Sequence, residues 1–201
     1  MATQSADLDG PLSRARSGDE AGFLELWRSL QPRLLRYLRV LGCDDPEDVA
    51  SETWLQVVRD LQRFSGSAAE FRRWLFTIGR HRAIDAARAR TRRRSSPVAD
   101  GLDGLADTHL VEDQVLDGLA LEKALALLGT LPSEQAEAVA LRVIAGLDTA
   151  AVADILGKSS GAVRVALHRG LRALAADPRV RALGARSGAT DRTLLALEEV
   201  D

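Results

Sequence analysis

The stretch GKSSGAVRVALHRGLRAL, residues 157–174, predicts a turn followed by a helix, and it comes directly after a shorter apolar pattern, DTAAVADIL, residues 148–156. Ala153, Gly157 and Val163 have the spacing that a helix-turn-helix needs. The small residue admits the second helix, the glycine ends the first helix with a positive φ, and the β-branched residue fills the crossing point. The apolar side of the second helix then consists of Val163, Leu167, Leu171 and Leu174.

The same helix carries its cations away from the apolar side, at Arg164, His168, Arg169 and Arg172. Cations in these places are available for the phosphates or base edges of duplex DNA. An ordinary pair of packed helices with a solvated basic face shows the same pattern. Both interpretations stay open on this stretch alone.

The composition of the 201 residues favours helices, because Ala, Leu and Arg dominate and aromatic residues make up only 4%. No alternating β segment stands out. We therefore predict an all-α fold of two small helical domains joined by a flexible acidic linker, the second domain ending in the helix-turn-helix. The boundaries we expect are a flexible tail over 1–18, a helical domain over 19–96, the linker over 97–118, a second domain over 119–176 and a tail over 177–201.

The sequence shows no residue pattern typical of metal binding, disulfide formation or membrane insertion. A single cysteine, Cys43, provides neither an internal disulfide nor a zinc cage, and the three histidines lack metal-ligand spacing. Neither a hydrophobic signal segment nor a run of membrane-spanning length is evident. We expect a cytoplasmic protein without membrane insertion, metal, cofactor or enzymatic activity.

The net charge of −2 conceals a strong segregation of charge. Residues 71–94 contain nine arginines and one acid, whereas residues 95–118 contain six acids and neither Lys nor Arg. Such neighbours attract at physiological salt, where the Debye length is ~8 Å. One expectation is a free chain in which the acidic linker, or the domain it tethers, lies over the arginine-rich helix; the alternative is a linker that ignores that helix.

An acidic helix precedes the arginine-rich one. Asp45 is placed to cap it, with Pro46 as the first helical residue. Helical periodicity puts Asp45, Asp48 and Glu52 opposite the apolar side. This acidic face is either a solvated helix surface or a docking face for a basic partner, where charge would set orientation and rate more than affinity.

The arginine-rich helix, FRRWLFTIGRHRAIDAARARTRRR over 71–94, also has two interpretations. Phe71, Trp74 and Phe76 interleave with its cations, and stacking surfaces beside cations suit single-stranded nucleic acid. The alternative is a solvated charged face above ordinary core packing. For the stripe of Phe71, Trp74, Leu75 and Ile78, core packing is the favoured interpretation.

Taken together, these motifs resemble those of the extracytoplasmic-function (ECF) sigma factors, the promoter-specificity subunits of bacterial RNA polymerase. PEDVASETWLQVVRDLQRF is similar to the core-binding helix of that family, and FRRWLFTIGRHRAIDAARARTRR to its promoter-melting helix. LPSEQAEAVALR resembles the opening of the family's second domain, and VADILGKSSGAVRVALHRGLRAL its terminal helix-turn-helix. The resemblance covers about residues 20–176, with the motifs in the family's order.

The resemblance implies partners and contacts. The partners would be core RNA polymerase (its beta and beta-prime subunits), promoter DNA and an anti-sigma factor. The polymerase would bind Asp45, Glu47, Asp48 and Glu52. The melted −10 strand would bind Arg63, Phe64, Ser67, Arg72, Arg80, His81 and Arg88. The −35 duplex would bind Ser159, Ser160, Arg164, His168, Arg169 and Arg172, with Arg164 best placed for base edges.

A stand-alone helix-turn-helix repressor or activator is the alternative function, since its terminal motif would look much the same. The acidic helix beside the arginine-rich helix favours the sigma factor, as does the lack of a ligand-pocket or receiver pattern. No Ser/His/Asp set, phosphate loop or paired-carboxylate site stands out in the sequence. An enzyme with an appended DNA-binding domain therefore finds no support.

Overall fold

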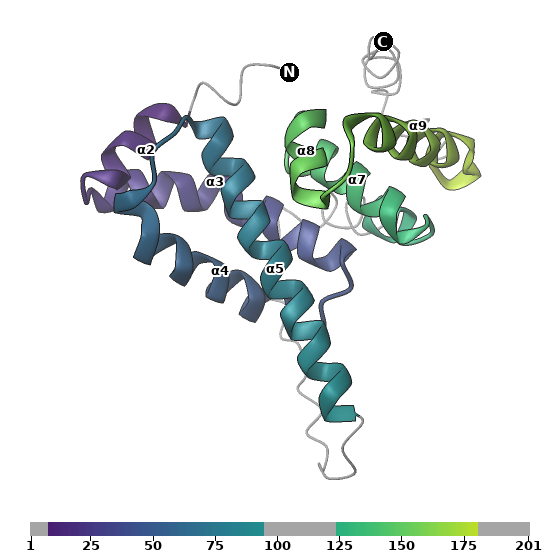
Figure 1. Ribbon diagram of the computed structural model, residues 1–201, viewed down its shortest axis with the longest axis horizontal. Coiled ribbons are helices and arrows are strands. Elements are labelled where there is room, and N and C mark those ends of the chain that lie inside the picture. Colours follow the sequence, from purple (N-terminus) through teal and green to yellow (C-terminus); the bar gives the residue numbers. More distant parts are fainter. Residues whose placement is uncertain (1–7, 95–123, 181–201) are drawn as a thin grey trace.

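The computed structural model describes residues 8–94 and 124–180, and every regular element in these ranges is helical, as the sequence predicted (Figure 1). The first helical unit (residues 8–94) comprises α2 (Asp9–Arg16), α3 (Glu20–Val40), α4 (Pro46–Asp60), the 3₁₀ turn η1 (Leu61–Arg63) and α5 (Ala68–Arg94). The second helical unit (residues 124–180) comprises α7 (Ser133–Val143), α8 (Thr149–Leu156) and α9 (Ser160–Ala176). The expected acidic linker, 97–118, lies outside the described residues.

Helix α2 corrects part of the expected flexible tail over 1–18, because residues 9–16 are helical. Leu8, Leu12 and Ala15 recur at helical spacing and are buried, so this segment has an apolar side to pack. It packs on α3 at Gly22. The Asp9 carboxylate also accepts a hydrogen bond of 2.7 Å from the backbone N–H of Ala68 at the start of α5. The glycines and proline near the N-terminus suggested a loop and hid this short apolar repeat.

Helix α3 is the central element of the first unit. It continues through Pro32 for 21 residues. Its apolar stripe is completely buried, at Leu26, Leu30, Leu34 and Leu38. Helices α4 and α5 pack on either side of this stripe and on each other. The long arginine-rich helix is thus held along its first half by ordinary core packing, with Phe71 and Leu75 fully buried.

The ends of α3 and α4 follow the sequence signals. Gly42 takes a positive φ of 72° just after α3. Asp45 then caps α4, because its Oδ1 accepts a 2.8 Å hydrogen bond from the backbone N–H of Asp48. Pro46 occupies the first helical position, where no N–H is needed.

The second unit contains the helix-turn-helix that the sequence predicted. Gly157 ends α8 in the left-handed conformation, with φ 63°. Val163 and Leu167 of α9 are buried against the unit, and Leu171 and Leu174 are partly buried at its edge. At Gly170 a Cβ would lie 2.9 Å from a methyl carbon of Val139. Glycine therefore sets how closely α9 approaches α7.

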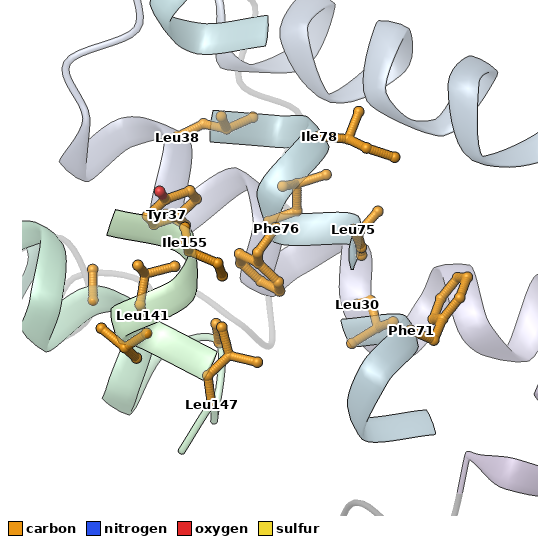
Figure 2. Packing of buried hydrophobic residues seen from close by; sticks show 14 of the residues in the cluster. Leu30, Tyr37, Leu38, Phe71, Leu75, Phe76, Ile78, Leu141, Leu147 and Ile155 are labelled. Carbon is orange, nitrogen blue, oxygen red and sulfur yellow. The ribbon is translucent and has the colours of Figure 1, made fainter. Parts of the chain in front are cut away.

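The two units pack against each other through α3 with α7 and α5 with α8. Their buried side chains form one continuous apolar cluster. Figure 2 shows the side chains that meet there: Tyr37 and Phe76 from the first unit, and Leu141, Leu147 and Ile155 from the second. The rings of Tyr37 and Phe76 meet edge to face, with their centroids 5.4 Å apart. The second unit therefore covers part of α3 and α5.

The docking of α2 generates a prediction at Gly22. A Cβ there would lie 2.8 Å from the Pro11 carbonyl oxygen and 2.9 Å from the Ala15 nitrogen. Because these are backbone atoms, α2 must move, and we expect Gly22→Ala to lower the free energy of unfolding by about 1–3 kcal/mol. Hydrogen exchange over residues 9–16 should accelerate. Gly10→Ala is the control, since a Cβ at Gly10 meets nothing within 4 Å; equal exchange in both variants would refute the packing of α2.

Candidate nucleic-acid interface

Helix α9 presents a basic surface to solvent. Its 17 residues contain no acid. Its three arginines, Arg164, Arg169 and Arg172, are all exposed, and so is His168. Because Val163 and Leu167 anchor the opposite side, these cations are held on a rigid element. The structure thus gathers the side chains that the sequence assigned to duplex DNA on one solvent-facing side.

The two serines at the start of α9 differ in their environment. Ser159 is the N-cap, and its Oγ accepts a hydrogen bond of 3.2 Å from the backbone N–H of Ala162. Ser160 is the first residue of the helix and half-exposed. Both lie at the positive end of a helix dipole, where a phosphate oxygen is stabilised. Their position matches a phosphate contact better than a base contact.

The loop before α5 carries an aromatic cluster and a helix cap. Phe64 stacks on Trp74 with ring centroids 5.1 Å apart and an interplanar angle of 19°, and it meets Phe71 edge to face. Arg63 and Ser67 are exposed, and Phe64 is half-buried. Trp74, also half-buried, packs at the edge of the core rather than standing free.

Ser67 and Glu70 form a capping box. Glu70 Oε2 accepts hydrogen bonds from the backbone N–H of Ser67, at 2.8 Å, and from its hydroxyl, at 2.9 Å. These two hydrogen bonds from Ser67 lower the pKa of the Glu70 carboxyl, and Arg73 adds to the shift. The cap fixes the conformation of the loop that was predicted to contact the melted DNA strand.

Two of the predicted strand-binding arginines are covered by the second unit. Arg72 is 3% exposed, and its Nη1 donates to the Gly146 carbonyl oxygen at 3.4 Å. Burial lowers the pKa of this guanidinium, and the neighbouring Arg33 lowers it further. In this arrangement the loop before α8 covers Arg72, so the predicted strand contact requires that loop to move away.

Arg80 is covered in the same way. Its Nε donates to Glu137 Oε1 of α7 at 2.8 Å, and only 24% of its side chain is exposed. Desolvation lowers the pKa of Arg80, but the hydrogen bond and the attraction of Glu137 outweigh it and raise that pKa above its usual value. Arg80 is therefore charged and already paired, so its predicted strand contact requires the pair with Glu137 to open.

His81 and Arg88 remain exposed beyond the covered part of α5. Arg88 lies 3.6 Å from Asp85 in a solvated pair, which contributes little. The predicted strand-binding set is thus divided. Arg63, Ser67, His81 and Arg88 face solvent, Phe64 is half-buried, and Arg72 and Arg80 lie beneath the second unit.

The acidic residues of α4 face solvent as predicted: Asp45, Glu47, Asp48 and Glu52 are all exposed. Glu47 pairs with Arg39 at 2.9 Å and Glu52 with Arg82 at 3.8 Å. Exposed pairs of this kind are weak and screened by salt. A basic partner surface can therefore displace them at small cost.

Sequence reasoning missed the residues that join the two units. Glu137 accepts from Arg80 and, at 3.0 Å, from the hydroxyl of Tyr37. Burial raises the pKa of the Tyr37 phenol well above its usual value, and Glu137 raises it further, so the hydroxyl stays protonated and donates. One sequence signal was available: Glu137 is a single acid between two small apolar residues, Ala136 and Ala138.

Within residues 8–94 and 124–180, no cluster of His, Cys, Asp or Glu has the arrangement of a metal site. In the same ranges no helix is both long and apolar enough to cross a membrane.

Two family descriptions match the chain, one on each helical unit. Sigma-70 region 2 matches residues 26–93, and Sigma-70 region 4 matches residues 121–174. The first match covers α3 to α5, and the second covers α7 to α9.

Two proteins of similar sequence are ECF RNA polymerase sigma factors. The chain is 36% identical to the ECF RNA polymerase sigma factor SigF of Caulobacter vibrioides, over 87% of this chain and 96% of that protein. It is 31% identical to ECF sigma factor BldN of Streptomyces coelicolor, over 86% of this chain and 66% of that longer protein. Among solved structures, CnrH in complex with the cytosolic domain of CnrY matches with a TM-score of 0.57 and 25% identity, over 84% of this chain and 96% of CnrH.

The capping box before α5 generates a pH prediction. The Glu70 carboxyl has a lower pKa in the folded chain than its unfolded value of about 4.3, so its cap is present above that value and lost as pH falls through the folded pKa. Hydrogen exchange in the first turn of α5, corrected for intrinsic rates, should show protection falling with pH in that range. In Glu70→Gln, which cannot titrate, the protection should stay level; a parallel fall in both proteins would exclude the cap as its cause.

Proposed function

The chain belongs to the ECF sigma factors, and from that premise we propose how its two helical units divide the work of promoter recognition. As a member of this family it directs promoter-specific initiation of transcription by RNA polymerase. One observation carries the proposal: an exposed, acid-free basic helix in the region 4 match and an arginine-rich helix in the region 2 match occur in one chain, in the family's order.

The second unit would read the −35 element as duplex DNA. In a helix-turn-helix the second helix enters the major groove with its first turns against the base edges. Arg164 stands in the first turns of α9 and is the best candidate for a base contact. Ser159, Ser160, His168, Arg169 and Arg172 would hold phosphates and fix the register.

The first unit would hold the unpaired −10 strand. Unstacking a base costs a few kcal/mol, which a pocket and phosphate contacts recover. The loop around Arg63, Phe64 and Ser67 would accept the unstacked base beside the aromatic cluster. Arg72, Arg80, His81 and Arg88 would hold the phosphates along α5, once the first two are uncovered.

The acidic face of α4 would dock on core RNA polymerase, at its beta and beta-prime subunits, through Asp45, Glu47, Asp48 and Glu52. Polymerase would supply the chemistry, so we propose no enzymatic activity for the chain itself, and we place it in the cytoplasm where polymerase works. CnrH, the solved relative above, is bound to the cytosolic domain of CnrY. As the family resemblance implies, we propose an anti-sigma factor as a further partner of this chain.

Purified core polymerase and a library of promoter fragments test this function. The chain should create new start sites with core polymerase alone. A stand-alone repressor or activator, which the family matches do not favour, would create none.

The docking face generates a charge-reversal prediction. We expect Asp48→Lys with Glu52→Lys to weaken binding to core polymerase by about tenfold or more, since like charge at a docking face costs several kcal/mol. Both side chains are exposed, so the fold should be unaffected. Glu20→Lys, an exposed acid on α3, is the control for a general charge effect. Unchanged affinity and unchanged salt dependence in the double variant would eliminate this face as the docking site.

Helix α9 generates a second prediction, which separates base from phosphate contacts. Arg164→Ala should cost ~1–3 kcal/mol of discrimination at the base it reads, and Arg169→Ala should weaken binding evenly and lower the salt slope by about one. Both arginines are exposed, so neither change should disturb packing. The measurement is affinity for single-base variants of the −35 duplex at several salt concentrations. An identical loss on every sequence for both variants would show that the base contact is misassigned.

A further inference from the structure

The contact between the two units is built around Glu137. Only 15% of its side chain is exposed, and one carboxylate oxygen accepts both from Arg80 and from Tyr37. All three groups sit at the edge of the shared apolar cluster, with Tyr37 itself completely buried. The carboxylate belongs to the second unit and both of its donors belong to the first.

Further contacts extend this junction along α5. Arg73 pairs with Asp154 of α8 at 2.6 Å, and Arg72 donates to Gly146 in the loop between α7 and α8. Phe76 is completely buried in the cluster that both units share. Three neighbouring cations of α5 are therefore held by acceptors of the second unit.

The contacts that hold the units together occupy groups that a DNA strand would need. A guanidinium that donates to a carboxylate cannot present the same N–H to a phosphate, and a completely buried ring cannot stack on a base. A phosphate offers acceptor oxygens much like those of Glu137 and Asp154, so the second unit occupies these cations as a phosphate would. The second unit and the strand are competitors for one surface.

The duplex-reading helix takes no part in this contact. The cations of α9 are exposed while α7 and α8 rest on the first unit. Figure 1 shows α9 on the side of the second unit that is remote from α5. The same arrangement therefore hides one DNA-binding surface and leaves the other open.

We propose that the second unit is an intramolecular mask over α5, held by the pairing of Glu137 with Arg80 and Tyr37, so that the free chain binds duplex DNA through α9 but takes a melted strand only after the units separate. This inference rests on the proposed function, because it assumes that α5 is the strand-binding element. It names a lock that neither family match assigns. The mask lowers the affinity for a single strand and leaves the affinity for duplex DNA unchanged. A chain that is open about one tenth of the time binds a strand about tenfold more weakly than one that is always open.

The first test measures the distance between the units without DNA or polymerase. Full-length chain with Cys43→Ser, Arg59→Cys and Ala173→Cys carries a fluorescent donor and acceptor on the first and second units. Glu137→Arg should increase the separation, because it places like charge beside Arg80. Adding Arg80→Glu to Glu137→Arg should restore the short distance. Glu134→Arg is the matched control, since Glu134 pairs with Lys158 inside the second unit.

A second variant guards against misfolding. Asp154 is 62% exposed, so Asp154→Arg breaks the pair with Arg73 without disturbing any core. It should open the chain partially, with the helical circular dichroism unchanged. An unchanged distance in both Glu137→Arg and Asp154→Arg would overturn the lock.

The second test measures binding of a fluorescent twelve-residue oligothymidine and of a random duplex by the same chains. Glu137→Arg should bind the oligothymidine about fivefold to tenfold more tightly than the unsubstituted chain, and Glu134→Arg should not. Duplex binding should be equal for Glu137→Arg and Glu134→Arg, which carry the same net charge. A chain that opens but gains no strand affinity would overturn the mask. Transcription by the unsubstituted chain with core polymerase separates that result from a failure of the proposed function.

Discussion

Glu137 is a largely buried carboxylate, and the placement of the two helical units follows from the need to pair it. A buried charge without partners is costly, and no side chain within residues 124–180 is seen to pair with this carboxylate. Arg80 and Tyr37 of the first unit provide both hydrogen bonds. The apolar surfaces around them supply much of the burial, but such surfaces are non-directional. The carboxylate and its two donors select the register in which α7 lies against α3.

The strength of this contact is limited by its composition. Around the central group lies an ion pair that is half solvated, with 44% of Arg73 and 62% of Asp154 exposed, so it contributes little. A core built only of leucine would hold the units together irrespective of any partner. The polar part of this junction is different, because each polar group released on opening regains water or meets a phosphate. The contact thus favours one arrangement without making it irreversible.

Most of the fold was predictable from local signals. Asp45, Gly42 and Gly157 marked helix ends correctly because a cap or a positive φ depends on neighbours within a few residues. The basic side of α9 was predictable for the same reason, since an amphipathic helix fixes which side faces solvent. Helix α2 was missed because glycine and proline outweighed a three-residue apolar repeat. The covering of Arg72 and Arg80 was missed because it depends on acceptor groups more than 50 positions away in the sequence.

The two surfaces that we propose bind DNA differ in a way that matches their proposed ligands. Duplex DNA exists before any protein arrives, so a surface for it loses nothing by standing open, and the cations of α9 do so on a rigid helix. A melted strand exists only after polymerase has engaged the promoter. Exposed arginines and aromatic rings would meanwhile bind other nucleic acid, since their attraction to phosphate is independent of sequence. Pairing Arg73 and Arg80 with acids of the second unit removes part of that competition.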